Sequence, residues 1–468
     1  VLDLSRNDFD HAGIECLARK LAVMEGLEEL YLGWCSIGDQ GAEILSKSLG
    51  NLGNLKVLEM RKNKIGNKSA AALAPALGMM TQLQTLNLRK NLIGDEGAVA
   101  LAQALEKMTR LQSLDLNCNQ LGGEGAVALA RAIGSLTELQ VLEMGGNNIG
   151  DKGAVALAPA LGKMTQLQTL HLHENKIGDQ GAVALAPALG KMTRLQELSL
   201  HWNRIGGHGG AALAPALGNM TQLKTLHLHE NKIGDQGAAA LAPALGNMTQ
   251  LQSVNLYCNK IGDQGAIALA SALINMTQLQ GLWLYENRIG DQGAAALAPA
   301  LGKMTQLQTL DLSWNRIGAD GAAALASALG NMTQLQELWL RRNKIEKSSA
   351  TMALVLENLI AFQTLQRFRD TKGNEMNADD DFHKILDAVA AVTEKRVTLD
   401  LSSWGLRDTD MSVLAPFLAK LDTLEELNLS QNRIGDDGVL ILSQCLTSLP
   451  NLRILNLDGN SIGSDGVR

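Results

Sequence analysis

The sequence predicts an α/β solenoid in which short parallel strands form one face and helices form the other. Alternating leucines followed by an asparagine return every 28 residues, a helical pattern follows them in each copy, and glycine supplies 47 of the 468 residues. Aromatic residues make up only 3% of the chain, so the core must be aliphatic. One repeat cannot bury its apolar side alone, and neighbouring copies must therefore stack on one another.

The repeat is most easily located by its asparagine. The pattern LxxLxLxxN places an asparagine at 7, 63, 91, 119, 147, 175, 203, 231, 259, 287, 315 and 343, and Cys35 fills the one gap. It resumes at Asn432 and Asn460, with Trp404 in the same phase. The interval between Asn343 and Trp404 fits one longer repeat, so we expect about 17 repeats in a single continuous solenoid.

Each repeat begins with a short strand. In a typical copy, Leu170 and Leu172 alternate with His171 and His173, which is the period of a strand with one buried face. Buried backbone groups need hydrogen-bond partners. We therefore expect the amide of Asn175 and its equivalents to bond backbone groups of the turn and of the neighbouring repeats, as a ladder along the stack.

A helix follows each turn. Asp179 stands where a helix N-cap is expected, and Leu185, Ala186 and Leu189 recur at helical spacing and should face inward. A proline inside a helix removes a hydrogen bond and kinks the helix. We therefore expect short, bent or interrupted helices at Pro159, Pro187, Pro215 and their equivalents.

These 28-residue units, LxxLxLxxNxIGDxGAxALAxAL, resemble leucine-rich repeats of the ribonuclease-inhibitor-like class, and the resemblance covers nearly the whole chain. It implies a horseshoe with parallel strands on the concave face and helices on the convex face. The class includes ribonuclease inhibitor, the sensor ends of NOD-like immune receptors and the GTPase-activating protein of Ran, which hold a protein or ligand in the arc.

The repeats are not uniform along the chain. We expect regular repeats over 1–343, a divergent repeat over 344–398 and regular repeats again over 399–468, truncated at both ends. A polar segment, 371–381, replaces the tight turn of the divergent repeat and should form an expanded loop. Its last three residues, Asp379, Asp380 and Asp381, suit the N-terminus of a helix and lack the ligand spacing of a calcium-binding loop.

Outward-facing strand positions vary most between copies. Every tryptophan and tyrosine except Trp404 lies one, two or four residues before a ladder position. Exposed aromatics on a rigid sheet are typical binding anchors, although packing against each other or drift after duplication would also place them there. We expect one recognition stripe formed by His171, His173, His201, Trp202, His227, His229, Tyr257, Trp283, Tyr285, Trp314, Trp339 and Arg341.

Three histidines of this stripe, His173, His201 and His229, are spaced by 28 and should stand on neighbouring strands. Strands lie about 4.8 Å apart, so two imidazoles could share a zinc ion. The favoured interpretation is a polar part of the binding surface whose affinity depends on pH. We predict no bound metal and no cofactor.

Charge and motifs exclude several functions. Basic pairs at Arg61 with Lys62, Arg89 with Lys90, and Arg341 with Arg342 suit an acidic partner or a solvated face. They are discontinuous and the net charge is -7, so we expect no nucleic-acid partner. Apolar runs are too short to span a membrane, and no phosphate-binding loop or nucleophile motif is present. We therefore expect neither an enzyme nor a membrane protein.

The sequence thus predicts a non-enzymatic module that binds a protein partner on its concave face. Five scattered cysteines favour a reducing, cytoplasmic location. The family resemblance suggests the sensing segment of a NOD-like receptor, within a longer polypeptide. The alternatives are a scaffold subunit of a large assembly and a Ran-type GTPase activator.

Overall fold

The computed structural model describes residues 1–329, 331–332, 334–340, 342–344, 398–402, 406–419 and 424–463. Contacts divide the chain into two compact units, Val1–Asn255 and Leu256–Arg468, which are described separately. The predicted loop at 371–381, most of the divergent repeat, Trp404 and Arg341 lie outside the described residues. Of the helices in the described ranges, none has the length and apolar character that crossing a membrane requires.

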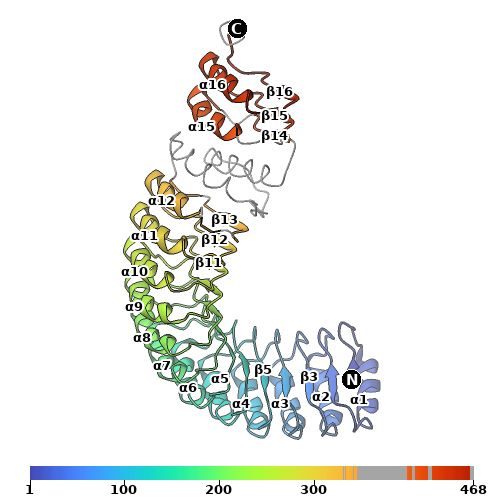
Figure 1. Ribbon diagram of the computed structural model, residues 1–468. Coiled ribbons are helices and arrows are strands. Elements are labelled where there is room, and N and C mark those ends of the chain that lie inside the picture. Colours follow the sequence, from blue (N-terminus) through green and yellow to red (C-terminus); the bar gives the residue numbers. More distant parts are fainter. Residues whose placement is uncertain are drawn as a thin grey trace. The chain divides into compact units, whose positions relative to one another are not determined.

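The first unit alternates strands and helices in every repeat (Figure 1). Its strands are β1 (Leu2–Asp3), β2 (Glu29–Tyr31), β3 (Val57–Glu59), β4 (Thr85–Asn87), β5 (Ser113–Asp115), β6 (Val141–Glu143), β7 (Thr169–His171), β8 (Glu197–Ser199), β9 (Thr225–His227) and β10 (Ser253–Asn255). Its helices are α1 (His11–Leu21), α2 (Gly38–Leu49), α3 (Asn67–Leu77), α4 (Asp95–Leu105), α5 (Gly123–Ile133), α6 (Gly150–Leu161), α7 (Asp179–Leu189), α8 (Gly207–Gly218) and α9 (Gly234–Asn247).

The second unit continues the same alternation. Its elements are α10 (Asp263–Leu273), β11 (Gly281–Trp283), α11 (Asp291–Leu301), β12 (Thr309–Asp311), α12 (Ala319–Leu329), β13 (Glu337–Trp339), β14 (Thr398–Asp400), α15 (Asp408–Leu418), β15 (Glu426–Asn428), α16 (Asp436–Leu446) and β16 (Ile454–Asn456). Strands β11 to β13 form one parallel set, and β14 to β16 form another.

The successive strands of the first unit, and those within β11 to β13 and within β14 to β16, pair in parallel through equivalent residues of neighbouring repeats. Leu170 pairs with Leu198, for example, and His171 pairs with Ser199. In the inner repeats, the leucines in and just after the strands are buried, as Leu170 (fully buried) and Leu172 (1% exposed) are. The predicted solenoid is therefore confirmed. The helices cover one side of each sheet, and we call the open side, formed by the residues two and four before each ladder position, the strand face.

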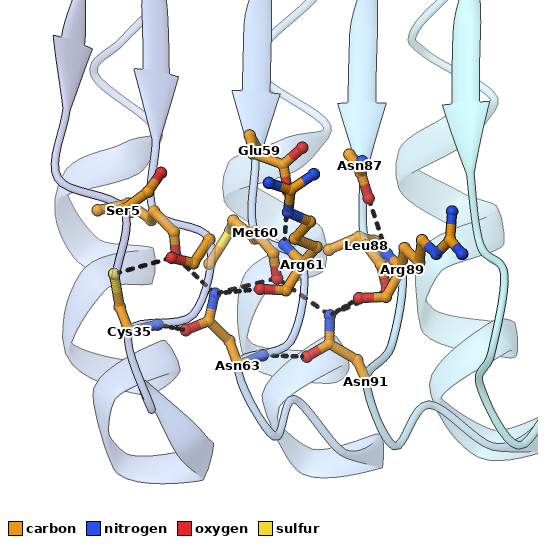
Figure 2. Close-up of polar contacts among 12 residues, drawn as sticks. Ser5, Cys35, Glu59, Met60, Arg61, Asn63, Asn87, Leu88, Arg89 and Asn91 are labelled. Carbon is orange, nitrogen blue, oxygen red and sulfur yellow. Dashed lines mark hydrogen bonds and ion pairs between the residues drawn. The ribbon is translucent and has the colours of Figure 1, made fainter. Parts of the chain in front are cut away.

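The predicted asparagine ladder is present. The Asn63 amide Nδ2 donates to the carbonyl oxygens of Leu32 (2.7 Å) and Met60 (3.0 Å), and its Oδ1 accepts from the backbone N–H of Cys35 (2.9 Å). The Asn63 backbone N–H then donates to Oδ1 of Asn91 (2.9 Å), as Figure 2 shows. Each side chain thus satisfies buried backbone groups of its own repeat and of the preceding one.

Cys35 takes the ladder position in the second repeat. Its Sγ lies 3.1 Å from the carbonyl oxygen of Leu4, where the thiol can donate. Burial raises the pKa of Cys35, which keeps the proton that this contact needs. A thiol has one weak donor, so Cys35 replaces the amide only in part.

The predicted N-cap role of Asp179 is wrong in one respect, because Asp179 serves the next helix. Helix α7 begins at Asp179 and its N-cap is Gly178, which has no capping side chain. The Asp179 carboxylate instead accepts from the backbone N–H groups of Gly206 (2.6 Å) and Gly209 (2.9 Å), at the N-terminus of α8. A carboxylate suits unpaired N–H groups at the positive end of a helix. Asp151 caps α7 in the same way.

The predicted interruption of helices at proline is also wrong. Pro187 lies inside α7, which has 11 residues, the same length as the proline-free α10. The N–H that proline lacks would have bonded the carbonyl of Val183. Both residues lie on the exposed side of the helix, where water can bond that carbonyl. The helices are short in repeats with and without proline.

Close packing between repeats leaves little room for a side chain at Gly181. A Cβ built at Gly181 would lie 2.7 Å from Oδ1 of Asp151 and 2.7 Å from Cγ2 of Ile177. We expect Gly181→Ala to lower the free energy of unfolding by about 1–3 kcal/mol, because such overpacking forces neighbours to shift. Urea denaturation measures this. Gly53→Ala is the control, since its Cβ would meet nothing within 4 Å, and an equal loss in both variants would contradict the explanation.

The ladder predicts a larger loss for Asn203→Ala. Asn203 is 8% exposed, and its amide donates to the carbonyls of Leu172 (2.9 Å) and Leu200 (3.0 Å) and accepts from Ile177 N–H (2.9 Å). Each buried group left without a partner costs about 1–3 kcal/mol, so we expect a total of about 3 kcal/mol or more in urea denaturation. The exposed Asn219→Ala should change little.

Candidate binding face

The strand face carries the histidines and aromatics that the sequence predicts to lie outward. His171 and His173 are partly exposed, whereas Leu170 and Leu172, which alternate with them, are buried. Outward orientation does not leave every side chain open to solvent, since His229 is only 8% exposed. Its neighbours on the same face cover it.

Five histidines of the first unit form one histidine cluster: His171, His173, His201, His227 and His229. The rings of His173 and His201 are stacked, with centroids 4.5 Å apart and planes 2° apart, and the ring of His229 stacks on His201 at 4.1 Å. His171 and His227 meet this row edge-on, at 5.8 Å from His173 and 5.7 Å from His229. The structure thus brings all five together as predicted from the 28-residue spacing.

A glycine makes room for one end of the stacked row. Gly145 occupies the strand-face position of the preceding repeat, and a Cβ there would overlap the His173 ring. The next residue, Gly146, has φ +64, a conformation that glycine adopts readily. The His173 ring therefore lies over backbone, which removes it from water and leaves its Nδ1 buried without a hydrogen-bond partner in the described residues.

Burial makes these imidazoles resist protonation. Loss of water and the neighbouring His171 lower the pKa of His173 to about 4, and loss of water and the neighbouring His227 lower that of His229 to about 3. The pKa of His201 lies lower still, for the same reason. At neutral pH the row is therefore an uncharged, polarisable surface.

Two carboxylates lie beside His171 at the edge of the histidine cluster. Nε2 of His171 donates to Oε1 of Glu197 (2.9 Å), and its Nδ1 lies 3.7 Å from Oε1 of Glu143. This hydrogen bond lowers the pKa of Glu197. Burial, followed by the Glu143 charge, raises the pKa of the nearby Asp115. His171 is thus positioned by acids on both sides, a feature that the sequence analysis missed.

The stacked row is not arranged to hold a metal ion. An imidazole binds a metal through a nitrogen lone pair in the ring plane, at about 2.0–2.1 Å for zinc. Rings stacked face to face at 4.5 Å direct their lone pairs along parallel planes, which do not converge on one ion. Within the described ranges, no group of three or more His, Cys, Asp or Glu side chains is placed to hold a metal ion.

The second unit contains the aromatic part of the predicted stripe. Tyr257 and Tyr285 stack with ring centroids 4.1 Å apart. The Trp283 ring folds back over Gly281, where a Cβ would overlap it. Trp339 lies on β13, next to Asp311 of β12. These four aromatic side chains are only partly exposed, because neighbouring rings and strands cover them.

The residue just before each ladder position adopts a left-handed backbone conformation, and we call these residues the loop ridge. Among the described residues they are Arg6, Trp34, Lys62, Lys90, Cys118, Gly146, Glu174, Trp202 and Glu230 in the first unit, and Cys258, Glu286, Trp314, Arg342, Gln431 and Gly459 in the second. The φ of each lies between +51 and +68. The three tryptophans among them are the most exposed aromatics of the described residues, at 44% for Trp34, 51% for Trp202 and 50% for Trp314.

Two of these tryptophans are paired with a cation from the next repeat. The Lys62 Nζ lies 3.3 Å from the ring centroid of Trp34, and the Arg342 guanidinium lies 4.9 Å from that of Trp314. Both pairs are cation–π contacts between residues 28 apart. Comparing the loop-ridge residues of successive repeats in the sequence would have predicted both contacts. Trp202 instead has Glu174 and Glu230 at the neighbouring ridge positions.

Sequence models of the leucine-rich repeat family match the chain. One, described as a leucine-rich repeat region, matches residues 120–271. A second, described as a leucine rich repeat, matches residues 27–46, 54–74, 80–102, 107–130, 303–326, 421–443 and 448–468. A comparison with curated proteins found no match.

Several solved structures are similar to the chain. An internalin of Listeria monocytogenes is 25% identical over 79% of this chain and 87% of that chain, with a TM-score of 0.57. The Arabidopsis receptor kinase HAESA, solved with the peptide hormone IDA and the co-receptor SERK1, is 20% identical over 98% and 78%, with a TM-score of 0.50. A leucine-rich-repeat protein of Leptospira interrogans is 18% identical over 97% and 94%, with a TM-score of 0.47.

The histidine cluster predicts a loss of stability in mild acid. The pKa values of His173 and His229 lie below the ordinary 6.5, so the unfolded chain takes up protons first. Stability is fully present above pH 6.5 and declines as the pH falls toward 4. Melting temperatures at pH 7.5 and 5.5 test this. His201→Gln should reduce the difference, because His201 stacks on both rings, whereas the exposed His208→Gln should preserve it.

Proposed function

Because the chain belongs to the leucine-rich repeat family, we propose that it is a non-enzymatic module that binds a protein partner through its strand face and loop ridge. The observation that carries this proposal is the exposure of Trp34, Trp202 and Trp314 at left-handed backbone positions. A bulky residue in this conformation costs about 1–2 kcal/mol, and glycine at the equivalent Gly146 avoids that cost.

These tryptophans contribute little to the stability of the fold. Each leaves about half of its surface in water, so burial recovers only part of what a tryptophan can supply. The ladder hydrogen bonds at these positions use the backbone N–H alone, as in Trp202 N–H to the His229 carbonyl (3.0 Å). A large rigid side chain held outward is better explained by a partner that buries it.

The histidines and aromatics of the strand face extend this binding surface. We include in it His171, His173, His201, His227 and His229 of the first unit, and Tyr257, Trp283, Tyr285, Trp339 and Arg341 of the second, with Trp202 and Trp314 on the ridge. Uncharged imidazoles and half-buried rings offer flat, rigid contact area at a small loss of side-chain entropy. No cofactor is required for such recognition.

The finer assignment is to the ribonuclease-inhibitor-like class, as the sensing segment of a cytoplasmic NOD-like receptor within a longer polypeptide. The 28-residue repeat and its helices of 11 to 14 residues support the class. The complex of HAESA with a peptide hormone is an example of ligand recognition by the same fold. A scaffold held through its helix face is the alternative, and a Ran-type GTPase activator is another.

A pull-down with matched variants tests the proposal. We expect Trp202→Ala or Trp314→Ala to weaken binding of the partner by about thirtyfold, since truncating such an anchor typically costs about 2 kcal/mol or more. Both side chains are exposed, so folding should be preserved. The control is Val155→Ala on α6, which is 51% exposed and removes apolar surface from the helix face.

The outcome separates the three functions. If only Val155→Ala releases the partner, the helix face binds it and the scaffold function is favoured. If the wild-type chain accelerates GTP hydrolysis by a small GTPase, the activator function replaces the proposal. Retention of the same partners by all variants would contradict recognition at the loop ridge.

A further inference from the structure

A small pocket opens on the first unit beside the loop ridge, away from the histidine cluster. It encloses about 210 Å³ and is lined by Trp34, Ser36, Lys62, Lys64, Lys90 and Leu92. These residues flank the ladder positions of three successive repeats, just after β2, β3 and β4. All six are exposed, so a ligand can reach the pocket directly.

The charge of this pocket is uncompensated. Three of its six lining residues are lysines and none is acidic. In the part of the chain that the structure describes, Lys62, Lys64 and Lys90 form no ion pair within 4.0 Å. Arg61 and Arg89, just after β3 and β4, add two further cations, and the nearby Glu59 carboxylate lies 3.8 Å from the Arg61 guanidinium. This concentration of positive charge stands out in a chain of net charge -7.

The backbone holds the lysines in place. Lys62, Lys64 and Lys90 have φ values of +54, +60 and +54, and the ladder hydrogen bonds fix these turns. The Lys62 ammonium rests on the Trp34 ring, 3.3 Å from its centroid, which restrains a side chain that is otherwise flexible. Trp34 and Leu92, 44% and 48% exposed, add apolar surface. The pocket thus combines anchored cations with an apolar wall.

Two other repeats of the same unit have a glutamate at the ridge position beside the equivalent lysine. Lys176 and Lys232 follow the ladder as Lys64 does, but there the ridge residues are Glu174 and Glu230. Two neighbouring repeats of this unit have a lysine at the ridge position, Lys62 after β3 and Lys90 after β4, and Lys64 follows the ladder residue of the first of them. No other two neighbouring repeats of the unit share this pattern. The basic cluster is therefore a property of these repeats and not of the repeat pattern.

We propose that this pocket binds an acidic protein segment, with a carboxylate between the lysines and an apolar side chain against Trp34 and Leu92. The inference rests on the proposed protein-binding function and adds the chemistry of one partner segment. A long nucleic-acid strand fits less well, because the strands on either side of β2 to β4 carry acidic residues, Asp3 on β1 and Asp115 on β5. A short acidic segment matches its extent.

The test uses the full 468-residue chain and two fluorescent peptides. In the first, glutamate pairs flank a leucine, and in the second, glutamines replace the glutamates. Fluorescence anisotropy should show binding of the first peptide only, weakened by raising salt from 50 to 300 mM. We expect Lys64→Glu to weaken binding by about tenfold through charge repulsion. Lys176→Glu should change it by less than about twofold, because Lys176 is exposed at the same repeat position with the same φ of +60.

Several results would overturn the inference. Equal weakening by Lys64→Glu and Lys176→Glu would indicate general electrostatic attraction. Equal binding of both peptides would remove the role of the carboxylates. Tighter binding of an oligonucleotide with the same charge would favour a nucleic acid, and displacement of the peptide by millimolar inorganic phosphate would indicate an unspecific anion site.

The two proposals can fail separately. If the acidic peptide does not bind but Trp202→Ala still releases a partner, only the pocket assignment is lost. If the peptide binds selectively and the Trp202→Ala and Trp314→Ala variants retain all partners, the strand-face proposal fails and the pocket remains.

Discussion

The structure depends on hydrogen bonds that each repeat makes for its neighbour. The ladder asparagine bonds backbone groups of the preceding repeat, as Asn63 does for Leu32 and Cys35, and the helix-start aspartate caps the following helix, as Asp179 does for Gly206. Because buried backbone groups must be paired, repeats joined in this way complete neither their ladder turn nor their helix N-terminus alone. This requirement fixes the parallel register, the glycines beside each aspartate and the left-handed residue before the ladder.

That framework determines where recognition can develop. Leucines and the ladder side chain are committed to the core, and the glycines to contacts between repeats. The strand face and loop ridge remain free to vary, since only their backbones take part in the ladder. In the first unit, this freedom produces a stacked row of uncharged imidazoles, His173, His201 and His229, beside β7 to β9 and a lysine-rich pocket beside β2 to β4. One scaffold thus presents chemically different surfaces at different repeats.

Much of the fold follows from the 28-residue period, because strand alternation, the ladder and the stacking of His173 on His201 are all consequences of exact repetition. What the period leaves open is contact between non-equivalent positions. Asp179 lies at the start of its own helix in sequence, yet its nearest donors belong to the next repeat. Gly145 under His173, and Glu197 beside His171, depend likewise on side-chain volume and direction across strands. The cation–π contact of Trp34 could have been predicted from the sequence, since Lys62 follows Trp34 by one repeat.

The aspartate cap between repeats also bears on how such a chain can grow by duplication. An inserted copy receives a cap from the repeat before it and supplies one to the repeat after it, so no new interface has to evolve. Its strand-face side chains lie next to the equivalent side chains of the copy from which they were duplicated, as His173 lies on His201. Lengthening the array therefore multiplies an existing surface at once, and later substitutions at single copies can specialise it without disturbing the hydrogen bonds that join the repeats.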